Sequence, residues 1–324
     1  MKKKNLGNTE LEITRIGLGT WAIGGPGWTY AWGPQDDAAS TKAIHKALEL
    51  GVNWIDTAAA YGLGHSEEVV GRAVAGRRDR VIIATKCGLV WDPGNPAPYG
   101  KLKAASVRRE LEASLRRLGT DYIDLYQIHW PKPDEDVEEA WAEISRHVKS
   151  GKIRYAGVSN FSVSQLERVR KIHPVASLQP PYSMLKRGVE EELLPYCLKN
   201  GIGVVAYSPM QAGILSGRFT RERAKNLPDD DWRKKSAAYT EPELSLNLRL
   251  VEKLAEFSNS RGRSVGELAV AWVNRRPEVT AAIVGGRSPE QVQELAGAAD
   301  WDLTPEEIAF VETSLSERAA QPLT

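Results

Sequence analysis

The chain has 324 residues, of which 42% are hydrophobic and 26% charged, which is typical of a folded globular protein rather than a disordered one. Its formal net charge of +1 gives no electrostatic reason to expect nucleic acid or a membrane as a partner. The N-terminal lysines precede no apolar run, no stretch is as long as a membrane span, and the two cysteines are far apart. We therefore expect a single domain over 1–324, a cytoplasmic location and a small-molecule partner.

A short hairpin is predicted at 3–13, where KKNLGNTELEI precedes the first apolar run. The chain then shows a series of short, nearly continuous apolar runs, which are typical of strands buried on both faces. These predicted strands lie at 15–19, 53–56, 81–86, 122–129, 155–159, 177–179, 203–207 and 280–284.

Helices are predicted between these strands. Hydrophobic residues repeat at three- and four-residue steps in 106–118 and in 136–150, and Gly151 gives the second helix a natural end. Three patterns predict capping boxes at helix starts: SVSQ at 162–165, SPEQ at 288–291 and TPEE at 304–307.

Eight strands with intervening helices fit either a (β/α)₈ barrel or a doubly wound open sheet. The open sheet normally carries G-x-G-x-x-G after its first strand, and the glycines of GLGTWAIGG do not fit that spacing. We therefore predict an α/β fold, a (β/α)₈ TIM barrel whose floor is closed by the N-terminal β-hairpin. A long charged loop is expected over 208–242, with a helix resuming near Glu243.

Polar side chains stand at the C-terminal ends of the predicted strands, which face the same side of a parallel barrel. Asp56 ends the second strand, Lys86 the third and His129 the fourth, and Tyr61 follows Asp56 after the small residues TAAA. Each alone has an ordinary interpretation as a helix cap, a core tyrosine, a solvent-facing lysine or a satisfied histidine. Their position at one end of adjacent strands favours a shared site, because buried polar groups need partners.

The chemistry of these four groups predicts proton delivery to an oxygen. An isolated tyrosine has a pKa of about 10, and a nearby ammonium is expected to lower it. Asp56 would keep Lys86 charged, Lys86 would favour the Tyr61 phenolate, and His129 would orient a carbonyl oxygen. General acid catalysis of this kind contributes roughly 10²–10⁴-fold to the rate of carbonyl reduction.

Motifs along nearly the whole chain resemble the aldo-keto reductase family. They are IGLGTWAIGG, DTAAAYGLGHSEEVVGRAV, ATKCG, LEASLRRLGTDYIDLYQIHWP, SGKIRYAGVSNFS, LQPPYSML, VVAYSPMQAGILSGRF and IVGGRSPEQVQEL. The pattern looks closest to the bacterial branch of general stress and inositol-cluster reductases. It is similar, more distantly, to the β-subunits of voltage-gated potassium channels.

The resemblance implies an NADP-dependent oxidoreductase that reduces aldehydes or ketones to alcohols on a (β/α)₈ barrel, with NADPH/NADP⁺ bound in extended form beneath the 208–242 loop. It implies a catalytic tetrad of Asp56, Tyr61, Lys86 and His129, with Tyr61 as the general acid. The resemblance also implies the cofactor contacts. Ser159, Asn160 and Gln179 would hold the carboxamide and Tyr207 would stack on the nicotinamide ring, while Thr20 and Trp21 would lie near the ribose. The pyrophosphate would meet Ser208, Pro209, Met210 and Gln211, with Arg218 nearby, the adenosine end would meet Gly285, Arg287, Gln291 and Glu294, and Asp56 is also expected to contact the cofactor.

The residues themselves favour NADPH over NADH, because RSPEQ places Arg287 beside a helix N-terminus and both features attract a phosphate. Aromatic residues are candidates for the wall of a substrate pocket: Trp28, Tyr30, Trp32, Trp91 and Trp130. Two other functions stay open. One is a barrel lyase that uses Lys86 as a Schiff base, and the other is a cofactor-binding regulatory subunit with slow turnover. The sequence shows no H-E-x-x-H spacing for a metal and no G-x-S-x-G elbow.

Overall fold

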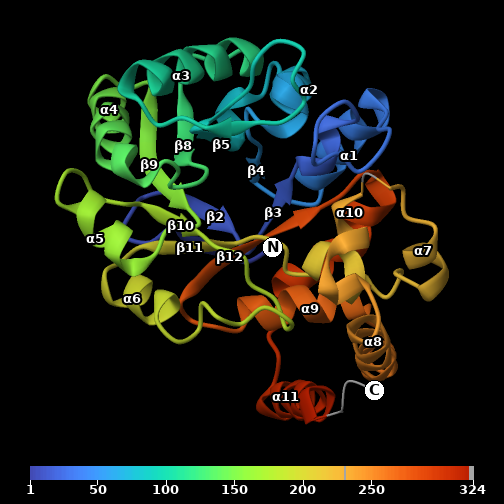
Figure 1. The fold of residues 1–324 in the computed structure, drawn as a ribbon. Helices are drawn as coiled ribbons and strands as arrows, with labels where there is room; N and C mark the ends of the chain where they lie inside the picture. The colour runs from blue at the N-terminus through green and yellow to red at the C-terminus, as the bar shows by residue number, and fades with distance from the viewer. Residues whose placement is uncertain (230, 321–324) are drawn as a thin grey trace.

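The computed structural model describes residues 1–229 and 231–320. Parallel strands close into a barrel in the order β10-β11-β12-β3-β4-β5-β8-β9, and helices surround it (Figure 1). The barrel strands are β3 (Ile16–Gly19), β4 (Trp54–Asp56), β5 (Ile82–Cys87), β8 (Ile123–Ile128), β9 (Ile153–Ser159), β10 (Ser177–Gln179), β11 (Gly203–Ala206) and β12 (Val279–Gly285). The predicted TIM barrel is confirmed, and no predicted strand end is more than two residues from the observed one.

The outer layer consists of α-helices that turn one apolar face toward the barrel, except for the short helix α7, which buries none of its residues. In α3, for example, the side chains of Val107, Leu111, Leu115 and Leu118 are all buried. The helices are α1 (Asp37–Glu49), α2 (His65–Val74), α3 (Ala104–Leu118), α4 (Val137–Lys149), α5 (Val163–Arg170), α6 (Leu193–Lys199), α7 (Arg221–Lys225), α8 (Glu243–Asn259), α9 (Val265–Asn274), α10 (Pro289–Ala296) and α11 (Pro305–Ala320). No helix among the described residues is long and apolar enough to cross a membrane.

Two of the three predicted capping boxes form. The boxes at 162–165 and 304–307 have both reciprocal hydrogen bonds. The prediction for 288–291 was half wrong. The Ser288 hydroxyl accepts the Gln291 N–H, but the Gln291 side chain accepts the N–H of Arg287 instead of closing the box.

The N-terminal hairpin closes the floor of the barrel, as predicted. Its strands β1 (Lys3–Asn5) and β2 (Glu12–Thr14) pair antiparallel. Leu6, Leu11 and Ile13 pack into the interior cluster with Trp54, Ala84, Leu125, Val205, Ala281 and Ile283. Because the hairpin covers the N-terminal ends of the strands, the C-terminal ends are the open side of the barrel.

The connections on the open side carry structure of their own. The loop after β11 includes the 3₁₀ turns η5 (Gln211–Ser216), η6 (Trp232–Lys235) and η7 (Ala237–Tyr239) as well as α7, and α8 begins at Glu243 as expected. A hairpin whose strands β6 (Leu89–Val90) and β7 (Tyr99–Gly100) have two residues each follows β5. It was not predicted, because strands this short show no hydrophobic alternation. The remaining 3₁₀ turns are η1 (Trp21–Gly24), η2 (Tyr61–Gly64), η3 (Arg78–Arg80), η4 (Asp134–Asp136) and η8 (Gly297–Asp300).

Candidate active site

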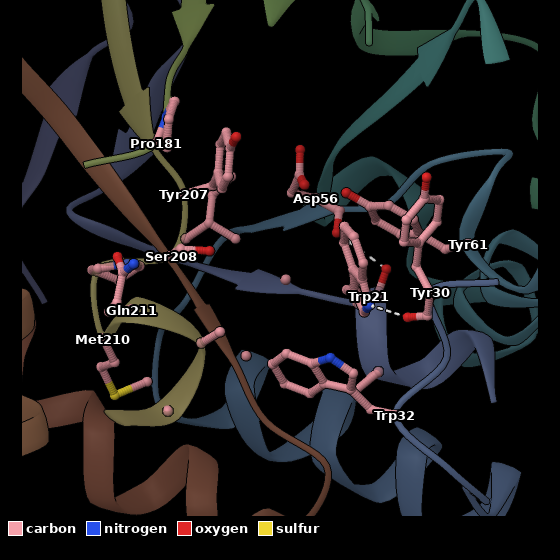
Figure 2. Close-up of a pocket in the computed structure, with 18 of the residues that line it drawn as sticks. Trp21, Tyr30, Trp32, Asp56, Tyr61, Pro181, Tyr207, Ser208, Met210 and Gln211 are labelled. Carbon is pink, nitrogen blue, oxygen red and sulfur yellow. Dashed lines mark hydrogen bonds between the residues drawn. The ribbon is translucent and has the colours of Figure 1, made fainter. Parts of the chain in front are cut away.

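A large cavity of about 920 Å³ opens at the C-terminal ends of the barrel strands. Figure 2 shows Tyr207, Ser208, Met210 and Gln211 on one side of it, the aromatic residues around Tyr61 on the other, and Asp56 between them. The cavity is lined by all the cofactor-binding residues predicted from the sequence, namely Thr20, Trp21, Asp56, Ser159, Asn160, Gln179, Tyr207, Ser208, Pro209, Met210, Gln211, Arg218, Gly285, Arg287, Gln291 and Glu294. Tyr61 and His129 line it as well.

The structure joins Asp56, Lys86 and Tyr61 in one hydrogen-bonded chain. The Lys86 ammonium donates to Asp56 Oδ2 at 2.7 Å, to the carbonyl of Thr57 at 2.9 Å and to Tyr61 Oη at 3.2 Å. All three N–H groups of the ammonium are therefore used. Lys86 is fully buried and does not line the cavity. Of the three hydrogen-bonded residues, only Tyr61 and Asp56 reach the cavity.

A tight contact between two turns holds Tyr61 at the cavity mouth. Tyr61 begins η2, and the next residue, Gly62, has a φ of +61°. A Cβ at Gly62 would lie 2.1 Å from the carbonyl oxygen of Gly24 in η1, so only glycine fits there. The small residues TAAA are buried beneath this turn and leave the phenol ring unobstructed.

Burial raises the pKa of Tyr61 well above its ordinary value, and the negative charge of Asp56 adds to the shift. The sequence-based expectation that Lys86 would lower this pKa was therefore wrong. Burial also lowers the pKa of Lys86, although Asp56 opposes that shift. The physical reason is that desolvation of an interior phenol outweighs one neighbouring ammonium whose charge is already compensated. At neutral pH, Tyr61 is a protonated hydrogen-bond donor.

His129 follows β8, and its ring stands edge-on to the Tyr61 ring, with centroids 5.8 Å apart at 77°. Its ring nitrogens make no hydrogen bond to the described residues, so they are free to bind a ligand. Burial lowers the pKa of His129 well below its ordinary value, and the charge of Lys86 contributes. The imidazole is neutral at neutral pH and can donate one hydrogen bond without carrying charge.

The second carboxylate oxygen of Asp56 binds two glutamines. The side-chain amide of Gln179 donates to Oδ1 at 2.8 Å, and that of Gln127 lies at 3.5 Å. Gln127 was not predicted from the sequence. It is fully buried in β8, two residues before His129, and its signal was a polar residue inside an otherwise apolar strand.

The residues predicted to hold a carboxamide bind one another in this structure. The Ser159 hydroxyl donates to the Gln179 carbonyl at 2.8 Å. The Asn160 amide donates to the His129 carbonyl at 3.1 Å and accepts from the Tyr207 hydroxyl at 2.9 Å. A carboxamide bound here would replace some of these hydrogen bonds with its own, because all of these residues line the cavity.

The segment after β11 has an unusual backbone. Ser208, Gln211 and Ala212 have φ values of +55°, +47° and +45°, a region that side chains other than glycine adopt rarely and at a cost. Positive-φ residues are common in concave backbone sites for anions. In this segment the N–H groups of Gln211 and Gly213 are bonded to the carbonyls of Ser208 and Met210. Tyr239 stabilises the segment, because its hydroxyl donates to the Gln211 carbonyl at 2.5 Å.

The residues predicted at the adenosine end all line the cavity, but one of them pairs with the arginine that was predicted near the pyrophosphate. Arg218 and Glu294 form an ion pair. The Arg287 guanidinium donates to Gln35 Oε1 at 2.6 Å and to backbone carbonyls of the loop after β3. Among the described residues no carboxylate contacts Arg287, so its charge has no opposite charge beside it.

Two further arginines near Arg287 were missed by the sequence analysis. Burial lowers the pKa of Arg287, and Arg223 and Arg233 add to the shift through charge repulsion. Arg233 pairs with Asp231 and stacks over the Trp32 ring at 4.9 Å. Both arginines lie in the 208–242 loop. The sequence showed that this loop is charged, but not that these two side chains line the cavity. Among the described residues, Arg223 and Arg287 therefore bring uncompensated positive charge to one end of the cavity, beside the Arg233–Asp231 pair, and this charge suits a phosphate.

Aromatic rings form the wall beside Tyr61. The centroid of the Trp21 ring lies 5.3 Å from the ring centroids of both Trp28 and Tyr61. The Trp21 indole N–H donates to the Tyr30 carbonyl at 3.0 Å (Figure 2). Trp130 lines the cavity at its rim. The expectation was wrong for Trp91, which does not line the cavity, and Trp32 lies at the arginine end instead of in this wall.

A model of the aldo/keto reductase family matches residues 15–315 of the chain. The chain belongs to the aldo/keto reductase family. It is 39% identical to the aldo-keto reductase YhdN of Bacillus subtilis, over 100% of this chain and 96% of that protein. It is 34% identical to the NADH-specific methylglyoxal reductase of Escherichia coli, over 94% and 95%.

Among solved structures, the glycerol dehydrogenase AKR11B4 from Gluconobacter oxydans matches with a TM-score of 0.90 and 38% identity, over 99% of this chain and 97% of that one. Aldo-keto reductases are oxidoreductases that act on carbonyl compounds with nicotinamide cofactors. The comparisons therefore agree with the class of chemistry that the strand-end residues predicted.

Proposed function

We propose that this aldo-keto reductase uses NADPH to reduce aldehydes or ketones to alcohols, with Tyr61 as the general acid. The observation that carries the proposal is the chain from Asp56 through Lys86 to Tyr61, which ends at the cavity with a protonated phenol. When bound, the nicotinamide would supply a hydride to the carbonyl carbon.

The residues of the chain would handle the oxygen and its proton. Tyr61 donates its proton to the carbonyl oxygen as that oxygen gains negative charge, and a phenolate remains. The Lys86 ammonium, 3.2 Å from Tyr61 Oη, stabilises that phenolate, and Asp56 holds the ammonium in place. His129 donates a hydrogen bond to the same carbonyl oxygen and orients it.

The geometry argues against the Schiff-base lyase. Lys86 does not line the cavity, and each of its N–H groups already has an acceptor. A buried ammonium beside a carboxylate cannot attack a carbonyl. Turnover of NADPH with a small aldehyde tests the proposal against the regulatory alternative, which requires tight cofactor retention and very slow turnover.

The cavity suits a dinucleotide with a phosphate on its adenosine ribose. Ser159, Asn160 and Gln179 lie at the catalytic end, the positive-φ segment lies alongside, and Arg287 lies at the far end. Arg287 donates only to neutral acceptors, which a phosphate would replace with a charge-assisted bond. This supports NADPH, although one relative is named as NADH-specific.

Replacing Arg287 with alanine is expected to weaken NADPH binding about tenfold, which is roughly 1.4 kcal/mol, and to leave NADH binding nearly unchanged. Fluorescence titration with each reduced cofactor measures both values. Arg221→Ala is the matched control, because Arg221 lies in the same long loop, pairs with Glu241 and does not line the cavity. Equal weakening of both cofactors, or none, would contradict the phosphate assignment.

The pH dependence of the two directions is expected to differ. Reduction needs a protonated Tyr61, whose pKa is raised, and a neutral His129, whose pKa is lowered. The rate of reduction should therefore stay nearly constant from about pH 6 to about pH 9. Alcohol oxidation needs the Tyr61 phenolate and should rise with pH across that range. Profiles of kcat/KM in both directions check this, and a fall in reduction centred near pH 6.5 would contradict it.

A further inference from the structure

The cavity wall carries an excess of positive charge. The cations that line it are Lys132, Lys186, Arg218, Arg223, Arg233 and Arg287, of which Arg233 is paired with the buried Asp231. The acids that line it are Asp56 and Glu294, and each is paired, Asp56 with Lys86 and Glu294 with Arg218. A cleft lined by one sign of charge attracts ligands of the other sign. Arg223, Arg233 and Arg287 are near one another at the end assigned above to the cofactor phosphate, but Lys132 is not part of that group.

Lys132 lies beside the catalytic groups. It is three residues after His129, so their Cα atoms are at most about 11 Å apart even in a fully extended chain. The actual path is shorter, because the Lys132 N–H donates to the Trp130 carbonyl at 2.8 Å and turns the chain. Because Lys132 lines the same cavity as Tyr61 and His129, it is available to a small molecule whose carbonyl oxygen those two residues bind.

The backbone of Lys132 is held firmly. A Cβ on Gly100 in β7 would lie 2.5 Å from the Lys132 carbonyl oxygen, so the β6–β7 hairpin packs directly against this residue. The ammonium lies 5.9 Å from the centroid of the Trp130 ring, which is partly exposed at the rim. A cation held over an aromatic face keeps its N–H groups free for an anion.

Lys132 has no carboxylate partner among the described residues, although acidic residues follow it closely in the chain. Asp134 pairs with Arg168, and Asp136 pairs with Lys103. The lysine instead lines the cavity with its charge uncompensated.

We propose that the substrate carries an anionic group, a carboxylate or a phosphate, a few bonds from its carbonyl, and that Lys132 binds this group. The inference rests on the proposed reductase function and adds the substrate class to it. Tyr61 and His129 bind the carbonyl oxygen of the substrate. Trp130 packs over the carbon atoms that join this carbonyl to the anionic group. Lys186, which lines the same cavity, supplies a second positive charge.

The test compares two aldehydes of similar length, succinic semialdehyde, which is anionic, and butanal, which is neutral, each with NADPH. The wild-type protein is expected to have a higher kcat/KM for succinic semialdehyde. Lys132→Gln should lower the ratio of the two kcat/KM values about fivefold, the upper range for a partly exposed ion pair. Lys132→Arg should keep most of the ratio, and added salt should reduce the wild-type ratio toward that of Lys132→Gln. Glyceraldehyde 3-phosphate against glyceraldehyde reports whether a phosphate is preferred to a carboxylate.

Lys199→Gln is the matched control, because Lys199 is an exposed lysine on α6, has no ion-pair partner among the described residues and does not line the cavity. It should leave the ratio unchanged. If the protein reduces both aldehydes and Lys132→Gln does not change their ratio, the substrate inference is overturned and the proposed function stands. If the protein reduces no aldehyde with NADPH or NADH, the proposed function is overturned and this inference with it.

Discussion

Replacing Tyr61 with phenylalanine is expected to lower kcat for carbonyl reduction by about 10²–10⁴-fold while cofactor affinity stays nearly unchanged. The substitution removes only the hydroxyl, which accepts a hydrogen bond from Lys86 at 3.2 Å and is the proton donor in the proposed reaction. The ring itself still packs against Trp21 and Trp28, so the cavity wall keeps its shape. Steady-state kinetics at saturating cofactor measure the loss.

Tyr30→Phe is the control for this experiment. Tyr30 belongs to the same aromatic wall, but its hydroxyl is not joined to Lys86, so its loss should cost little in kcat. A Tyr61→Phe protein that keeps kcat within about tenfold of wild type would show that another group supplies the proton.

Replacing Lys86 with methionine is expected to be the most destabilising single change in the site, at about 3–5 kcal/mol, because it leaves a buried charge without its partner. The Asp56 carboxylate would retain only the amides of Gln179 and Gln127 in place of an ammonium at 2.7 Å. Activity should fall as well, since no charge would stabilise the Tyr61 phenolate. Urea unfolding measures the stability change.

A double variant separates the two effects. Lys86→Met with Asp56→Asn removes both charges of the pair, so much of the stability should return because the remaining amide is neutral. Activity should not return, because the group that stabilises the phenolate is still missing. A Lys86→Met protein that loses less than about 1 kcal/mol would show that water or a side-chain shift compensates the carboxylate.

The barrel and the positions of the proposed catalytic groups were predictable because both depend on patterns local in sequence. Short apolar runs determined the strands, and a polar residue at the end of each run placed Asp56, Lys86 and His129 on one face. Tyr61 was placed near the same site because it follows Asp56 by only five residues in the sequence. Parallel strands of a barrel bring such residues together whatever lies between them in the chain.

The parts that could not be predicted depend on contacts between loops and on burial. Arg287 donates to Gln35, 252 residues away, and no local pattern connects these two positions. Arg218 and Glu294, both predicted to contact the cofactor, neutralise each other across 76 residues. The direction of the Tyr61 pKa shift depends on how fully the phenol is removed from water, which the sequence does not report.

The tryptophans that line the cavity also make the protein an optical reporter of its own ligands. Half of the chain's ten tryptophans line the cavity, namely Trp21, Trp28, Trp32, Trp130 and Trp232. A ligand that absorbs in the near ultraviolet, as a reduced nicotinamide does, would accept excitation energy from these indoles at close range and quench their emission. Rapid-mixing experiments could then follow ligand arrival and departure at both ends of the cavity without any attached dye.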